Sequence, residues 1–157
     1  MREARRNQVP VIFVATEHDQ ATDSEAWLSR YGKNFDRVKT NLSCRKGTWG
    51  TAFYVVEPEK EEIVVIKHKY SAFVGTDLDN LLQSLGIQSL LFTGVATNIC
   101  VESTLRDGLH HDYLVTLVDD CCATYDMTDH ISTIRNVENR FGMVATSEEI
   151  TGFWNKR

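Results

Sequence analysis

The stretch that decides the fold of this chain reads Leu90-Leu91-Phe92-Thr93-Gly94-Val95-Ala96-Thr97-Asn98-Ile99-Cys100-Val101-Glu102-Ser103-Thr104. A short apolar run, typical of a buried strand, ends in a Thr-Gly turn, and a helical pattern begins near Cys100. Open α/β sheets place their ligand sites at such turns. Unpaired backbone N–H groups at a helix N-terminus and the helix dipole both favour the thiolate, which is the reactive form of cysteine. Cys100 is therefore a candidate nucleophile, and the alternative is a small buried core cysteine.

Apolar runs and helical patterns alternate along the rest of the chain. The runs that predict buried strands lie at 11–15, 63–66, 89–93, 113–118 and 143–145. Helical patterns lie at 78–85, after Cys100, between Asp126 and Gly142, and from a capping box that begins at Thr146. Runs that are apolar on both faces are typical of parallel strands covered by helices. The alternation therefore predicts an α/β fold, a three-layer α/β/α sandwich with a mostly parallel sheet.

The length of 157 residues indicates one domain, spanning residues 1–157, and the composition is that of an ordinary globular protein. Residues 19–51 are less periodic and are expected to form loops with a short helix around 25–30. The net charge of −5 argues against nucleic-acid binding. No apolar segment approaches the roughly 20 residues of a membrane span. Four cysteines without zinc spacing, and opening residues that lack the apolar core of a secretory signal, indicate a reducing, cytoplasmic setting.

Three segments resemble those of the isochorismatase-like cysteine hydrolases. Residues 94–108 resemble the nucleophile segment of that family, and residues 67–73 resemble the segment that carries its lysine. Residues 119–124 are similar to the loop after the next strand of the family. Around Cys100 the sequence is most similar to ureidoacrylate and related carbamoyl-amide hydrolases. The resemblance implies an isochorismatase-like, Rossmann-like fold.

The resemblance further implies a Cys-Asp-Lys triad that hydrolyses a small amide or ureido C–N bond through a thioester acyl-enzyme. Carried over by position, Cys100 is the nucleophile and Lys67 is the cation that stabilises its thiolate. Without the resemblance, Lys67 would be interpreted as a solvated lysine at a strand end. The implied oxyanion hole consists of the backbone N–H groups of Ala96 and Cys100, after a non-proline cis peptide bond between Val95 and Ala96.

Asn98, Tyr70 and Phe73 are candidates for lining the pocket of a small-molecule substrate. The alternatives are that Phe73 belongs to the core and that Asn98 satisfies the backbone of the turn. Members of the family commonly form dimers or tetramers, so a homodimer or homotetramer is expected.

The sequence predicts neither a metal nor another cofactor. Nicotinamidases of the same superfamily carry an Asp-x-His cluster and a further histidine, whereas Glu17-His18-Asp19 supplies one histidine in that region. Three convergent ligands are the usual minimum for a catalytic metal site. Nicotinamide is therefore disfavoured as the substrate.

The resemblance also implies a strand that this chain does not contain. The family aspartate lies at the end of a first strand, whereas residues 1–10 are similar to the helix that follows that strand. We therefore expect a domain truncated at its N-terminus, with a strand missing between those that end at Ala15 and Thr93. Such a gap should expose apolar edges or leave a void. Glu17 and Asp19 are the nearby acids that could substitute for the aspartate.

Two functions of different classes remain open. One is a cysteine-dependent amidohydrolase, for which the start of the chain is miscalled or truncated. The other is a non-catalytic scaffold or pseudoenzyme that keeps the pocket and lacks the acid. Cys100 argues against vinyl-ether cleavage of the isochorismatase type, which typically does not rely on a cysteine there. No spacing brings its sulfur to Cys121 or Cys122 for redox chemistry.

Overall fold

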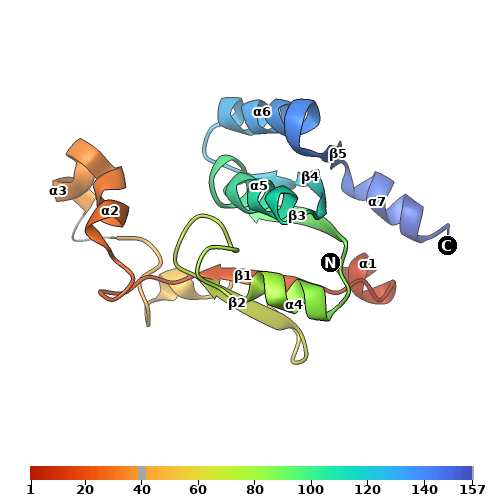
Figure 1. The fold of residues 1–157 in the computed structure, drawn as a ribbon, viewed down its shortest axis with the longest axis horizontal. Coiled ribbons are helices and arrows are strands. Elements are labelled where there is room, and N and C mark those ends of the chain that lie inside the picture. Colours follow the sequence, from red (N-terminus) through yellow and green to blue (C-terminus); the bar gives the residue numbers. More distant parts are fainter. Residues whose placement is uncertain (39–41, 157) are drawn as a thin grey trace.

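The strand pairings in the described part of the chain are all parallel. The computed structural model describes residues 1–38 and 42–156, and its strands are β1 (Ile12–Thr16), β2 (Ile63–Lys67), β3 (Ser89–Val95), β4 (Leu114–Ala123) and β5 (Met143–Ala145) (Figure 1). β1 pairs with β2, and β4 pairs with both β3 and β5. The strands coincide with the predicted apolar runs, and the α/β class with parallel strands is confirmed.

Helices precede, connect and follow the strands. They are α1 (Arg2–Arg6), α2 (Glu25–Leu28), α3 (Phe35–Val38), α4 (Leu78–Ser84), α5 (Glu102–His110), α6 (Met127–Asn136) and α7 (Ser147–Trp154). 3₁₀ turns lie at Ser29–Asn34 and Trp49–Thr51, and π-helical turns lie at Thr97–Val101 and Val137–Phe141. The capping box predicted at the start of α7 is confirmed, because Thr146 and Glu149 each accept a hydrogen bond from the backbone N–H of the other.

Strand β4 is longer than predicted. Residues 119–123, which the sequence suggested as part of a loop, continue the strand. The ladder between β3 and β4 shifts its register after Phe92 and then pairs Val95 with Ala123. The extension therefore supports β3 up to the turn that holds Cys100.

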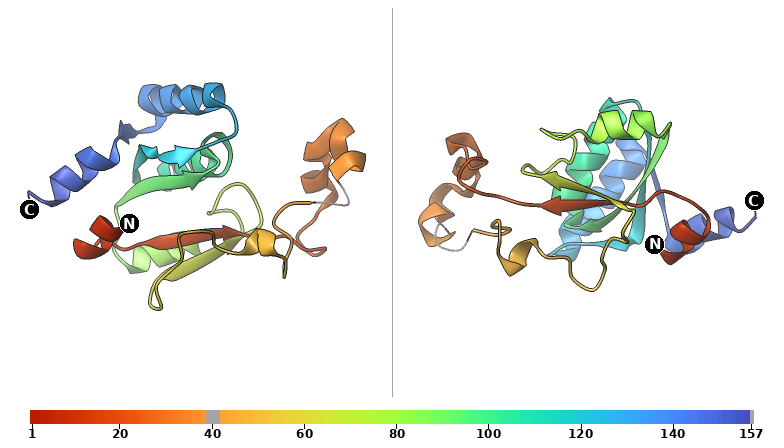
Figure 2. Two further views of the ribbon diagram at one scale, coloured as in Figure 1. Left: turned by 180° about the vertical axis from the view of Figure 1, so that it is seen from behind. Right: turned by 90° about the horizontal axis from the view of Figure 1, so that it is seen from below.

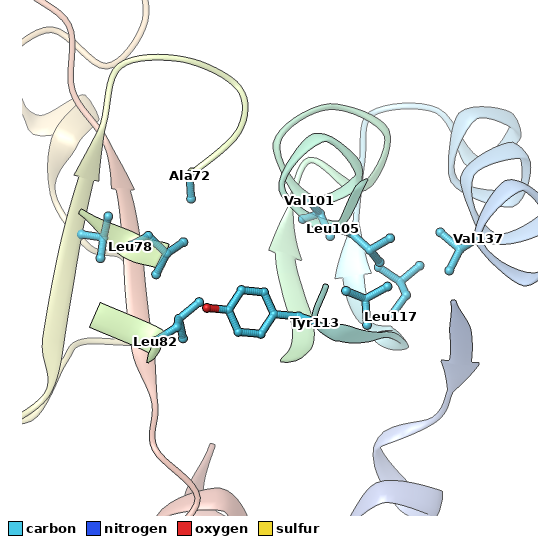
Figure 3. Close-up of a cluster of buried hydrophobic side chains, with 10 residues drawn as sticks. Ala72, Leu78, Leu82, Val101, Leu105, Tyr113, Leu117 and Val137 are labelled. Atoms are coloured by element: carbon cyan, nitrogen blue, oxygen red, sulfur yellow. The ribbon is translucent and has the colours of Figure 1, made fainter. Parts of the chain in front are cut away.

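The strands form two separate sheets, one of β1 and β2 and one of β3, β4 and β5. Figure 3 shows the strands in the order β2, β1, β3, β4, all pointing the same way, so β1 and β3 are the edge strands that face each other. Val14 on β1 and Leu91 and Val95 on β3 are exposed. The division lies between the two strands that the resemblance places on either side of a further strand. That a strand is missing there stays a prediction.

Tyr113, at the start of β4, links the two sides of this division. Figure 3 shows its ring reaching from the side of Leu117 towards Leu82 of α4, within one cluster of buried apolar side chains. The Tyr113 hydroxyl donates a hydrogen bond of 2.8 Å to Oδ1 of Asp79, also on α4. Burial is the larger cause and this hydrogen bond the second cause that raise the pKa of Tyr113 to about 12. The buried phenol is therefore held in its neutral form.

Tyr113→Phe is expected to lower the free energy of unfolding by about 1–2 kcal/mol near neutral pH, because it removes one hydrogen bond to a carboxylate and keeps the ring. The raised pKa means that this stabilisation is complete below the ordinary tyrosine pKa of about 10 and is lost as the pH rises towards about 12. Urea unfolding at neutral and at strongly alkaline pH measures both effects, and the two proteins should converge at alkaline pH. Tyr125→Phe, at an exposed position, is the control. Equal stability of wild type and Tyr113→Phe at neutral pH would contradict the bridging role.

Gly142, between the π-helical turn 137–141 and β5, packs directly against β4. A Cβ atom there would lie 2.3 Å from the backbone oxygen of Val115. Gly142→Ala should therefore lower the free energy of unfolding by about 1–3 kcal/mol through overpacking. Gly152→Ala is the matched control, because its Cβ would meet no atom within 4 Å and α7 should gain about 0.5–1 kcal/mol from the better helix former. Thermal denaturation compares the two, and a Gly142→Ala protein as stable as wild type would refute the close approach.

Candidate active site

Cys100 lies on the turn between β3 and α5, in the π-helical segment Thr97–Val101. It is half-buried. Single π turns are frequent at functional sites. One turn further on, Thr104 Oγ1 donates to Cys100 O at 2.6 Å and accepts from Ala72 N at 3.1 Å. The turn is thereby tied to the loop 68–77 that follows β2.

Lys67 is the last residue of β2, and it is buried, with 3% of its surface exposed. Its ammonium group donates a hydrogen bond of 3.2 Å to Cys100 Sγ and one of 2.7 Å to Lys69 O. Burying a charged amine is unfavourable unless it is paired, so these acceptors define its position. Lys67 is therefore not a solvated lysine at a strand end, and the structure brings together the two side chains that the resemblance paired.

The peptide bond between Val95 and Ala96 is cis, as predicted. Ala96 O accepts hydrogen bonds from Ile99 N and Val101 N, which closes the turn around Cys100. The N–H groups of Ala96 and Cys100 thus belong to one compact turn. Their function as oxyanion donors stays a prediction.

The three predicted pocket residues have different surroundings. Asn98 is held by protein partners, because its Nδ2 donates to Asp129 Oδ2 at 3.1 Å and its Oδ1 accepts from Thr124 Oγ1 at 2.7 Å. Phe73 packs against the core, with its ring stacked on His111 and Tyr113. The surroundings of Phe73 agree with the core alternative. Substrate binding by the three residues stays a prediction.

Tyr70 is the most exposed of the three candidates. It follows Lys67 in loop 68–77, and its ring packs against Trp27 of α2 at a centroid distance of 4.8 Å. Figures 1 and 2 show the segment of α2 and α3 projecting away from the sheets. Lys69 lies over the same Trp27 ring, and its Nζ donates to Thr22 O. Contacts from loop 68–77 therefore hold the projecting segment beside the site.

The two acids considered as substitutes for the missing aspartate are engaged elsewhere. Glu17 forms an ion pair of 3.2 Å with Lys46. Asp19 accepts hydrogen bonds from the N–H groups of Thr22 and Ala21, which lower the pKa of its carboxyl group. Within residues 1–38 and 42–156, the side-chain partners of Lys67 and Cys100 include no carboxylate. The described residues thus bring together the two side chains that the resemblance assigns as nucleophile and cation, and neither of the two acids joins them.

The other cysteines differ from Cys100 in their surroundings. Burial raises the pKa of Cys122 to about 12, and partial desolvation together with the neighbouring Asp120 carboxylate raises the pKa of the exposed Cys121. All four cysteines are free thiols. Across the described ranges, histidine, cysteine and acidic side chains form no group of three that could hold a metal ion. In the same ranges, none of the helices is long and apolar enough to cross a membrane.

One network near the site was not predicted. Thr97 Oγ1 lies 2.9 Å from His130 Nδ1, and His130 Nε2 lies 2.7 Å from Asp119 Oδ1. A threonine, a histidine on a later helix and an aspartate on a strand carry no joint signal in the sequence. The hydrogen bond of Thr104 to Cys100 O had a weak signal in the sequence, because Thr104 follows Cys100 by one helical turn.

Known proteins are similar to this chain in sequence. The Isochorismatase domain model matches residues 1–149. The ureidoacrylate amidohydrolase RutB of Agrobacterium fabrum is 42% identical over 111 residues, which cover 68% of this chain and 48% of that protein. RutB of Variovorax paradoxus is 40% identical over 159 residues, 93% of this chain and 62% of that protein. The chain spans about half the length of most curated relatives it matches.

Solved structures agree in fold. An isochorismatase family protein from Burkholderia thailandensis is 31% identical, with a TM-score of 0.78 over 98% of this chain and 78% of that one. A cysteine hydrolase from Pseudomonas syringae, 24% identical, has the same fold with a TM-score of 0.86, covering 99% of this chain and 76% of that one. Because the family model covers nearly the whole sequence, this chain belongs to the isochorismatase family.

Proposed function

We propose that Cys100 is the nucleophile of a hydrolase site for a small amide or ureido C–N bond, with Lys67 as its cationic partner. The observation that carries this proposal is the hydrogen bond of 3.2 Å from the buried Lys67 ammonium to Cys100 Sγ. A cation beside a half-buried sulfur favours the thiolate over the thiol. The thiolate is the species that attacks a carbonyl carbon.

The reaction proceeds in two halves. The Cys100 thiolate attacks the carbonyl carbon, a C–S bond forms, and the carbonyl electron pair moves to oxygen. When this oxyanion collapses, the C–N bond breaks, and the nitrogen leaves as ammonia or an amine with a proton from the Lys67 ammonium. Water then attacks the thioester, the C–S bond breaks, and the acid is released while Lys67 regains a proton. The N–H groups of Ala96 and Cys100 are the proposed oxyanion donors in both halves.

The names of the relatives support the proposed substrate class. Two proteins that are 40–42% identical to this chain bear the name ureidoacrylate amidohydrolase. We infer a small uncharged carbonyl flanked by nitrogen, with Tyr70 as the most accessible of the predicted pocket residues. A cytoplasmic setting fits four free thiols, which persist in reducing compartments. A homodimer or homotetramer without nucleic acid remains our proposal for the assembly.

A second candidate function is a non-catalytic scaffold of the same fold. The observation that favours it is the lack of a carboxylate among the side-chain partners of Lys67 and Cys100 in the described ranges. A general base contributes typically 10²–10⁴-fold to the rate of such a reaction. A site without one would bind a substrate and turn it over slowly.

Alkylation by iodoacetamide tests the Lys67–Cys100 pair without a substrate. Lys67→Met should slow the alkylation of Cys100 at neutral pH by roughly tenfold, because it removes the cation that stabilises the thiolate. Lys69→Met is the matched control, since its ammonium lies at Thr22 O and its backbone oxygen is kept. Mass spectrometry of the peptide that holds Cys100 separates its rate from that of the exposed Cys121. Equal rates in wild type and Lys67→Met would remove the basis of the proposal.

Ammonia release separates the hydrolase from the scaffold. A set of small carboxamides and ureido acids, including ureidoacrylate, is incubated with wild type and with Cys100→Ala. The hydrolase proposal expects release by wild type that falls to the uncatalysed rate in Cys100→Ala, because the nucleophile is lost. If the two proteins release ammonia equally from every compound, the scaffold is the correct function.

A further inference from the structure

We infer that His130 and Asp119 hold Thr97, and through it the turn that presents the N–H groups of Ala96 and Cys100. This makes His130 a positioning residue for the oxyanion hole, and the inference rests on the proposed function. The proposed site then includes, besides the Lys67–Cys100 pair, two supporting residues: Asp119 on β4 and His130 on α6.

The three side chains form a continuous chain from the surface to the turn. Thr97 is fully buried, the side chain of His130 is 12% exposed, and that of Asp119 is 43% exposed. The contacts are 2.9 Å from Thr97 Oγ1 to His130 Nδ1 and 2.7 Å from His130 Nε2 to Asp119 Oδ1. An open cavity of about 370 Å³ borders His130 and Asp119, whereas neither Cys100 nor Lys67 lines it. The outer end is therefore in contact with solvent while the inner end is not.

The carboxylate at the outer end determines the direction of the hydrogen bonds. The Asp119 carboxylate can only accept, so His130 Nε2 carries a proton and donates it. In the neutral ring Nδ1 is then an acceptor, and the Thr97 hydroxyl donates to it. The buried hydroxyl is satisfied in one orientation, which restrains the Thr97 side chain and the backbone next to it.

Thr97 stands between the two backbone donors. Ala96 precedes it directly, and Cys100 lies three residues later in the same π-helical turn. α6 holds this region at two more points, because Asp129 accepts from the Asn98 amide and Thr133 Oγ1 donates to Glu102 at 2.7 Å. Thr97 differs from Asn98 and Glu102 because it directly follows Ala96, one of the two proposed oxyanion donors.

Holding the turn should affect only the steps in which negative charge develops on the substrate oxygen. Oxyanion donors act only when they are aimed at the position that the oxyanion will occupy, and removing one typically costs about 10²–10³ in kcat. If the turn is loosened but the donors are still present, kcat should fall by less than the loss of a whole donor would cause. The hydrogen bonds of the His130 ring go to Thr97 and Asp119 and those of the Lys67 ammonium to Cys100 Sγ and Lys69 O, so the reactivity of the thiolate should be unaffected.

The test compares Thr97→Val, which deletes the hydroxyl and keeps the shape, with Thr97→Ser, which keeps the hydroxyl. Thr97→Val should lower kcat for ammonia release about tenfold with KM little changed, and Thr97→Ser should recover most of kcat. Alkylation of Cys100 by iodoacetamide forms no oxyanion and should stay within about twofold of wild type in both. Thr151→Val, which deletes a hydroxyl on α7 that bonds to Glu148 O, is the control with unchanged kcat.

His130 is tested by the two amides that mimic one ring nitrogen each. His130→Asn places an amide near Nδ1 and can keep the bond to Thr97, whereas His130→Gln can keep the bond to Asp119. The inference expects His130→Asn to retain more kcat than His130→Gln. The reverse order would overturn it, since the outer contact would then be the important one. Melting temperatures of all variants show that folding is kept.

A measurement without turnover completes the test. Acetaldehyde labelled with ¹³C adds reversibly to a cysteine thiol: the C–S bond forms, the thiol proton goes to the carbonyl oxygen, and that oxygen occupies the oxyanion hole. By ¹³C NMR the adduct should be about tenfold weaker in Thr97→Val than in wild type.

The outcomes separate this inference from the function on which it rests. Thr97→Val that matches Thr151→Val in kcat and adduct affinity overturns the inference and leaves the nucleophile in place. An equal loss of alkylation and hydrolysis also overturns it, because the whole site would then be disturbed. A wild type whose Cys100 neither forms the adduct nor reacts faster with iodoacetamide than Cys121 overturns the proposed function and the inference together.

Discussion

The hydrogen bond between Lys67 and Cys100 depends on two sheets that share no backbone hydrogen bond. Lys67 ends β2 in one sheet, and Cys100 follows β3 in the other. Side chains and loops hold the two halves together. Tyr113 donates a hydrogen bond to Asp79 across the core. The Thr104 hydroxyl accepts a hydrogen bond from Ala72 N and donates one to Cys100 O. A displacement of one half by about an ångström would separate the ammonium from the sulfur. The proposed chemistry therefore depends on tertiary contacts more than on backbone pairing within the sheets.

The turn after β3 concentrates the restraints. Its backbone closes on Ala96 O, and side chains hold it from three directions: Thr104 from α5, Thr124 from the end of β4, and His130 from α6. Such redundancy is what keeps a site preorganised, since each restraint limits a different movement. The shift in register between β3 and β4 also restrains the turn, because it brings the last residues of β4 alongside the end of β3.

The predictable part of this structure is local. The strands at 63–67 and 143–145 follow from short apolar runs, and α7 from a capping box, because periodicity and caps act over a few residues. The extension of β4 through residues 119–123 was not predictable, since it begins with two aspartates and its end is a strand because Cys122 and Ala123 pair with β3 after a shift in register. Asn98 shows the same limit: its amide is used by Asp129 and Thr124, which lie at least 26 positions away.

By itself the sequence determined the α/β class, the strand-to-helix turn and the choice of Cys100 and Lys67, the last through a resemblance carried by residues 67–73 and 94–108. These features depend on neighbours along the chain or on residue order. Tertiary structure alone decided that the Lys67 ammonium is buried and bonded to Cys100 Sγ and that His130 reaches Thr97. The physical reason is that hydrogen bonds between side chains 33 residues apart require both backbones to be placed within a few tenths of an ångström, and packing sets that placement.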